Sequence, residues 1–176
     1  DVLGITCQKP EVSFDTIMGR KNAVVAQLSK GVQSLLAAKK IEVIRGTAKV
    51  LDSRNVMIEE TGQRISSDHI LIATGSKSAG IAIEGIDGAD VMNSTQFLGM
   101  KSLPRSAVII GGGVIGVEFG QFLNAMGTKV TTIELAPNLI PGLDRQIAIL
   151  LEKMIVRSGI EVVTNATVKR VEHKGM

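Results

Sequence analysis

Three glycines and one glutamate in the second half of the chain have the residue types and spacing of a dinucleotide-binding site. Gly111, Gly113 and Gly116 fit the pattern GxGxxG, and Glu134 follows Gly116 by 18 residues. In such a site the first glycine allows a tight turn, the second lets a pyrophosphate approach the backbone, and the third lets a helix pack closely on a strand. The carboxylate then accepts the hydroxyl groups of an adenosine ribose. The chemistry indicated is binding of a dinucleotide.

The residues around these glycines predict the elements that would position them. Residues 107–110 form a continuous apolar run, typical of a parallel strand buried on both faces. Residues 114–126 carry apolar side chains at helical spacing, and Gly127 is suited to end that helix. Residues 129–133 are the next predicted strand, which Glu134 closes. The N-terminus of the helix, with free N–H groups and a partial positive charge, would face the phosphates.

The charges near Glu134 favour NAD over NADP. The next basic residue along the chain is Arg145, so a 2′-phosphate would meet the carboxylate of Glu134 without a neighbouring cation. The alternative is a glycine-rich turn that serves only packing. That alternative gives no reason for a glutamate at the end of the second strand.

The bulk properties describe a globular protein of one domain or two small ones. The chain has 176 residues, 44% hydrophobic, with a mean hydropathy of +0.26, and no apolar run approaches the roughly 20 residues that cross a bilayer. The net charge of +3 is dispersed and there is no Trp or Tyr to stack on bases, which argues against nucleic acid as a partner. One cysteine, Cys7, forms no disulfide framework and suits a reducing compartment.

The first half of the chain predicts a helix followed by short strands. Ser13 is a suitable N-cap for a helix over residues 14–40, interrupted near Gly19 or Gly31, whose apolar stripe is expected to face a core or, alternatively, a partner. Strands are predicted over residues 41–44, 46–51 and 56–59, with a turn at 60–63, as in a hairpin or meander.

The later segments contain further predicted elements. Residues 68–75, DHILIATG, predict a buried strand that ends in small residues, as strands beside ligand crevices do. Ser94 is expected to cap a short helix through Leu98. Asp144 is expected to cap a helix over 145–158, and strands are predicted at 160–163 and 167–172.

The motifs in combination resemble those of the flavoprotein disulfide reductases, of the pyridine nucleotide-disulfide oxidoreductase family. HILIATGS, IGGGVIGVEFGQFLNAMG, VTTIE and NATVKRVE occur in the order and at the distances found there, and most resemble the dihydrolipoamide dehydrogenases. The resemblance implies an α/β fold. Residues 1–103 would be the later portion of a split FAD-binding domain with a β-meander, and residues 104–176 the first portion of a Rossmann-like, three-layer NAD-binding domain with a parallel sheet.

The resemblance also implies roles for single residues. The loop from Gly111 to Gly116 would hold the NAD pyrophosphate, Glu134 the adenine ribose, and Val168 would lie against the adenine. Val114 would border the nicotinamide pocket, and Glu118 would lie near the flavin and the nicotinamide. The full set of cofactor-binding residues expected from the resemblance is Gly111, Gly112, Gly113, Val114, Ile115, Gly116, Glu118, Glu134 and Val168 for NAD, and Ala48, Thr74 and Gly75 for FAD.

The family chemistry needs groups that this sequence does not contain. The redox CxxxxC pair is expected before Asp1 and the catalytic His-Glu pair after Met176, so Cys7, His69 and His173 are assigned no chemistry, and no catalytic or metal-binding residue is expected here. The resemblance implies a central fragment, inactive by itself, of a homodimeric enzyme of the cytoplasm or mitochondrial matrix. That enzyme would oxidise dihydrolipoamide, or another dithiol, through a disulfide and FAD to NAD. Alternatives are a related flavoprotein of the mercuric reductase or NADH oxidase type, and a non-catalytic dinucleotide-binding module.

Overall fold

The computed structural model describes residues 11–88 and 90–172, which form two compact units. The smaller unit is Ile17–Lys77, and the larger unit contains the described residues on either side of it. The expectations for Cys7 and His173, and for residues 1–10 as a whole, lie outside the described residues.

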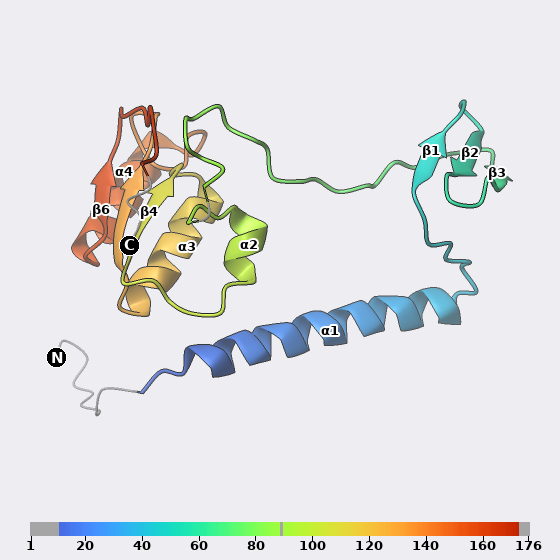
Figure 1. Cartoon of the computed structure of the whole chain (residues 1–176), viewed down its shortest axis with the longest axis horizontal. Coiled ribbons are helices and arrows are strands. Elements are labelled where there is room, and N and C mark those ends of the chain that lie inside the picture. Colours follow the sequence, from blue (N-terminus) through green and yellow to red (C-terminus); the bar gives the residue numbers. More distant parts are fainter. Residues whose placement is uncertain (1–10, 89, 173–176) are drawn as a thin grey trace. The chain divides into compact units, whose positions relative to one another are not determined.

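The larger unit is built on a parallel three-stranded sheet in the order β4-β5-β6 (Figure 1). Strands β4 (Ser106–Ile110), β5 (Lys129–Ile133) and β6 (Glu161–Val163) alternate along the chain with helices α3 (Val114–Ala125) and α4 (Arg145–Arg157). In the register, Ser106 lies opposite Lys129 and Thr131 opposite Glu161. The structure thus confirms the predicted βαβαβ arrangement, whose strands all end at the same edge of the sheet.

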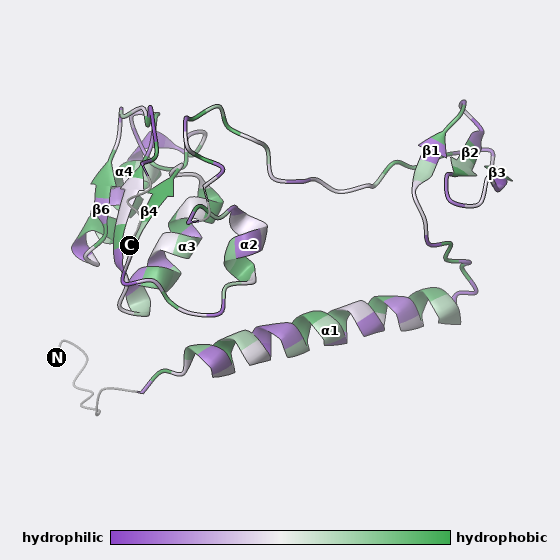
Figure 2. Ribbon diagram, in the orientation of Figure 1, coloured by the Kyte–Doolittle hydropathy of each residue, from purple (hydrophilic) through white to green (hydrophobic). Residues whose placement is uncertain are grey.

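One hydrophobic core joins the two helices to the sheet. Its most deeply buried side chains come from different elements and are less than 3% exposed: Leu139, Val130, Ile155 and Ile160. Figure 2 shows hydrophobic colouring on β4, on β6 and on parts of α3. Helix α2 (Ser94–Leu98) adds to this core, because the ring of Phe97 stacks on Phe119 of α3 with centroids 3.9 Å apart.

The helix caps follow the sequence closely, with one correction. Asp144 accepts hydrogen bonds from the backbone N–H groups of Gln146 and Ile147, as predicted. Helix α2 is capped by Asn93 and not by the predicted Ser94. Asn93 and Gln96 each accept a hydrogen bond from the backbone N–H of the other, which forms a capping box that a serine one residue later does not form.

Two strand predictions in the larger unit were wrong in detail. The strand at 107–110 is not buried on both faces, since the side chain of Val108 is 63% exposed and no described element covers it. Residues 167–172 form no strand. Within the described residues this segment has a single isolated bridge, between Arg170 and Glu84, because no neighbouring strand continues the ladder.

The smaller unit contains nearly all of helix α1 (Phe14–Ala38), which is continuous. Ser13 accepts a hydrogen bond from the backbone N–H of Thr16 and so acts as the predicted N-cap. The predicted interruption at Gly19 or Gly31 does not occur, since a glycine lowers helix stability without breaking the hydrogen-bond ladder. No described helix is long and apolar enough to span a membrane.

The apolar stripe of α1 does not face a core within the described structure. Most side chains along it are exposed, with Leu28 at 66%, and α1 has no buried residue. Burial of such a stripe requires a second apolar surface, and no strand of the smaller unit packs closely on α1. The prediction of a core-facing helix is therefore not met within the smaller unit.

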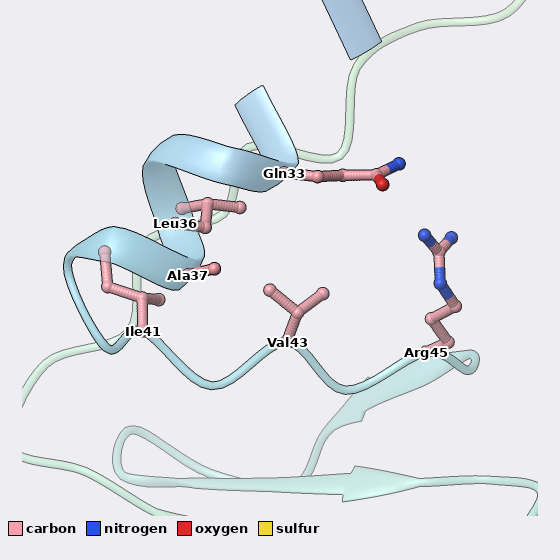
Figure 3. A pocket seen from close by; sticks show the side chains of 6 residues that line it. All are labelled: Gln33, Leu36, Ala37, Ile41, Val43 and Arg45. Atoms are coloured by element: carbon pink, nitrogen blue, oxygen red, sulfur yellow. The ribbon is translucent and has the colours of Figure 1, made fainter. Parts of the chain in front are cut away.

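The predicted meander is confirmed, with a third strand. Strands β1 (Ala48–Val50), β2 (Asn55–Ile58) and β3 (Arg64–Ser66) pair antiparallel in that order. Residues 41–44, predicted as a strand, have no strand partner. They run instead beside the last turn of α1, where Ile41 and Val43 line a shallow depression (Figure 3).

Residues 68–75 also form no strand, contrary to the prediction. Leu71 is 90% exposed, as expected for an apolar strand sequence that has no partner strand among the described residues.

The motif glycines Gly113 and Gly116 differ in the space around them, so substitution by alanine is expected to affect the free energy of unfolding differently at the two positions. A Cβ at Gly116 would lie 2.1 Å from the carbonyl oxygen of Gly111, whereas a Cβ at Gly113 would meet no atom within 4 Å. We predict that Gly116→Ala lowers the free energy of unfolding by about 1–3 kcal/mol. The matched Gly113→Ala should cost less, up to about 1 kcal/mol, because its only expected effect is the preference of a helix N-cap for glycine over alanine. Urea unfolding followed by circular dichroism measures both, and equal losses would contradict this packing.

Candidate dinucleotide-binding site

The glycine loop makes a tight turn directly after β4. Gly111 has φ +108°, a conformation that favours glycine, and its N–H donates to the carbonyl of Ile133 at 2.8 Å. Gly113 is the N-cap residue of α3, with an extended backbone at φ −70°. The chain therefore turns from strand to helix within three residues, as the sequence pattern predicts.

Gly116 and Gly120, both in α3, allow this helix to lie close to β4. A Cβ at Gly116 would overlap the backbone of Gly111, and one at Gly120 would lie 3.2 Å from Cδ1 of Ile109. Gly113 is different, because the position of its Cβ is open. This is the side from which a pyrophosphate would approach, so the cradle fits the group that the motif predicts.

The start of α3 supplies hydrogen-bond donors to this open side. The helix has 12 residues, and its first internal hydrogen bond runs from the N–H of Val117 to the carbonyl of Gly113. The N–H groups of the preceding turn have no partner inside the helix. They and the helix dipole make the site favourable for an anion.

Glu134 lies at the end of β5 and is 8% exposed. One carboxylate oxygen accepts the N–H of Gly112 at 2.6 Å, and the other accepts the N–H of Ala136 at 2.7 Å. Each oxygen keeps a further lone pair, so the carboxylate can still accept the two hydroxyls of a ribose. The fixed charge beside the loop is negative, which disfavours an additional phosphate at that place.

The remaining residues predicted for NAD lie in the same unit. Val114 and Ile115 are more than half exposed at the start of α3, and Glu118 is exposed one turn later. Val168 is partly buried, and the preceding Ala166 donates its N–H to the carbonyl of Glu134, so this segment runs past the end of β5. The structure thus brings the loop, Glu134 and the segment of Val168 to one edge of the sheet.

The residues predicted for FAD lie in the smaller unit. Ala48 is exposed in β1 opposite Ile58, and Thr74 and Gly75 are exposed in the extended segment after the meander. Thr47, just before Ala48, is held by Glu60, which accepts hydrogen bonds from its N–H and its hydroxyl. These hydrogen bonds lower the pKa of Glu60 below its usual value. By themselves the three predicted residues form no cradle.

Sequence reasoning missed two residues that touch the glycine loop. Leu139 is fully buried against Gly112, and Ile140 donates its N–H to the carbonyl of Gly112 at 2.8 Å. Both lie in a stretch predicted only as a loop, and the available signal was the middle glycine of GGG, Gly112, which the motif does not require. Within the described ranges, no group of His, Cys, Asp or Glu is arranged to hold a metal ion.

Comparison with known proteins agrees with this architecture. Residues 4–176 match the family described as pyridine nucleotide-disulphide oxidoreductase. The chain belongs to this family. Similar curated proteins include a dihydrolipoyl dehydrogenase of Bacillus subtilis, 38% identical over 98% of this chain, and one of Acholeplasma laidlawii, 39% identical over 93%.

A solved structure supports the same assignment. The HOCl-induced flavoprotein disulfide reductase RclA of Escherichia coli is 33% identical, covers 93% of this chain and superposes with a TM-score of 0.83. The chain spans 38% of the Bacillus protein, 50% of the Acholeplasma protein and 38% of RclA. It therefore corresponds to half or less of these members of the pyridine nucleotide-disulphide oxidoreductase family.

The open side of Gly113 gives a prediction for ligand binding. We expect Gly113→Val to abolish binding of NADH, because the side chain would occupy the approach of the pyrophosphate, while the extended backbone and the open space leave the fold intact. Calorimetry measures the binding and circular dichroism the fold. Normal NADH affinity in the folded variant would mean that the phosphates bind elsewhere.

Proposed function

We propose that this chain is the central part of a dihydrolipoamide dehydrogenase, in which it supplies the NAD site and part of the FAD site. In this proposal residues 104–176 are the first portion of the NAD-binding domain and residues 1–103 the later portion of the FAD-binding domain. The full-length enzyme would be a homodimer acting on dihydrolipoamide. The similarity to dihydrolipoyl dehydrogenases over nearly the whole chain supports the substrate class.

The observation that carries the NAD assignment is the glycine loop with Glu134 beside it. The loop combines an open approach at Gly113, the donors of the first turn of α3, and a carboxylate held by the N–H of Gly112. These groups match the pyrophosphate and the adenosine ribose of NAD. All lie beyond the carboxyl ends of parallel strands, where open α/β sheets bind ligands.

The residues of the chain would bind and orient rather than break bonds. The first turn of α3 would hold the pyrophosphate, Glu134 the ribose hydroxyls, and Val168 would lie against the adenine. Val114 and Glu118, exposed on the first turns of α3, would border the nicotinamide. Bound NAD would supply the hydride acceptor, and the dithiol chemistry needs the cysteine pair and base of the complete enzyme.

The FAD assignment concerns the smaller unit. Ala48 would meet the adenine of the flavin cofactor through its backbone, and Thr74 and Gly75 would lie beside the cofactor. The exposure of all three residues agrees with a site that needs further parts of the protein.

The similarity to RclA supports a second candidate, a flavoprotein disulfide reductase with another substrate. Mercuric reductase and NADH oxidase types share the same motifs, and a non-catalytic dinucleotide-binding module would use the same glycines. The full-length coding sequence distinguishes these classes. A CxxxxC pair upstream of Asp1 supports a disulfide reductase, and its absence supports an oxidase or a module.

The position of Glu134 predicts a preference for NADH over NADPH. A 2′-phosphate would approach a carboxylate that is already fixed by two backbone N–H groups and has no cation among its described partners. We expect NADH to bind at least about tenfold more tightly, equivalent to roughly 1.4 kcal/mol. Calorimetry with both cofactors at one ionic strength decides this, and equal or tighter binding of NADPH would contradict the role of Glu134.

The 176-residue chain is predicted to purify with little or no flavin and to show no lipoamide reduction. Its own contacts to FAD are limited to Ala48, Thr74 and Gly75, without a second glycine loop for the flavin pyrophosphate. An absorbance scan for the flavin bands and an assay with NADH and lipoamide test this. A yellow protein with stoichiometric flavin would show that the FAD site is misplaced, and turnover would mean that Cys7 acts without a partner cysteine.

A further inference from the structure

The middle glycine of the loop, Gly112, contacts three residues of the segment that follows β5, residues 134–140. Its N–H donates to Glu134 at 2.6 Å, and its carbonyl accepts the N–H of Ile140 at 2.8 Å. A Cβ on Gly112 would lie 2.4 Å from Cδ2 of Leu139. The pattern GxGxxG leaves this position free, so the requirement for glycine here comes from the segment and not from the motif.

The segment itself is rigidly placed. Leu139 is completely buried in the core between the sheet and the helices. Ile140 has φ +48°, a left-handed conformation that is unusual for a β-branched residue. It is held there by its bond to Gly112 and by the N–H of Leu143, which donates to the carbonyl of Ile140 at 3.1 Å. Strained conformations of this kind persist where the surroundings fix them, often beside functional sites.

We propose that Leu139 and Ile140 are positioning residues for the dinucleotide site: they set the height and orientation of Gly112, and through it aim the neighbouring N–H groups at the pyrophosphate. The inference rests on the proposed NAD-binding function and deepens it. Leu139 supplies the steric stop on one side of Gly112, and Ile140 fixes the carbonyl. The open side of Gly113 is left to the ligand.

A role confined to core packing makes a different prediction. If Leu139 only filled the core, its contact with Gly112 would affect the free energy of unfolding and leave the NADH affinity of the folded protein unchanged. A positioning role requires that a displaced Gly112 weakens NADH binding in protein that remains folded. It also requires that the substitution at Gly112 costs less NADH affinity once the side chain of Leu139 has been shortened.

The test is a double-mutant cycle in the 176-residue chain, with NADH affinity measured by calorimetry and folding checked by circular dichroism. Gly112→Ala should weaken NADH binding by about tenfold or more, because the methyl group would overlap Cδ2 of Leu139, and a fully buried Leu139 leaves the loop as the part that we expect to shift. Combined with Leu139→Ala, the loss should shrink to about threefold or less relative to Leu139→Ala alone. Leu123→Ala is the matched control, a leucine that is 3% exposed in the same core but is not among the neighbours of Gly112.

The two leucine variants distinguish a positioning role from simple core packing. Rescue by Leu139→Ala and none by Leu123→Ala supports the proposal. Unchanged affinity of Gly112→Ala, no rescue, or equal rescue by both leucine variants overturns it. If the double variant does not fold, Gly112→Ala with Leu139→Val provides the same comparison. Failure of the unsubstituted chain to bind NADH would instead refute the proposed function, and would be seen before any variant is compared.

Discussion

The hydrogen bond from the N–H of Gly112 to the carboxylate of Glu134 is the interaction on which the site depends. It joins two residues 22 positions apart, at the ends of the neighbouring strands β4 and β5. The bond is buried, so its partners have little access to water, and loss of either one would leave a polar group without a partner. The turn proposed to face the phosphates is therefore fixed to the strand that ends beside the proposed ribose position.

In the proposed site one carboxylate would have two tasks. In the free protein, Glu134 satisfies the N–H groups of Gly112 and Ala136, and its remaining lone pairs are available to a ligand. A carboxylate already held by the backbone needs no rearrangement to receive ribose hydroxyls, which reduces the cost of ordering on binding. A substitution at Glu134 would therefore change both the conformation of the loop and the proposed ligand site. A substitution at Gly113 would change the ligand site while leaving the contacts of the loop in place.

The larger unit could be predicted from the sequence because its signals are local. The apolar run of β4, the glycines and helix caps such as Asp144 each determine the structure of the few residues around them. The structure confirms the strand, the turn and the helix start that they predict. The errors arose where an element depends on a distant partner. Residues 68–75 have the composition of a buried strand but no partner strand among the described residues, and the apolar stripe of α1 has no covering surface within the smaller unit. An apolar pattern shows which side chains of a segment can be buried, but it does not identify the surface that covers them.

The role of Gly112 shows a second limit. GxGxxG assigns no task to that position, and the residues that restrict it, Leu139 and Ile140, lie in a stretch without secondary structure periodicity. Only the three-dimensional arrangement of the two strand ends brings them together. The capping of α2 by Asn93 rather than Ser94 has a simpler cause, since two adjacent cap-forming residues compete and the partner Gln96 decides between them.

The most direct measurement of the site is an amide-resolved NMR titration of the chain with NADH. Signals of residues 111–116 should shift together and saturate with a single affinity, with smaller changes at Val168. The amide signals of the meander β1–β3 should not shift. Shifts confined to the meander, or a glycine loop unaffected at saturating NADH, would contradict the location of the dinucleotide site at the start of α3.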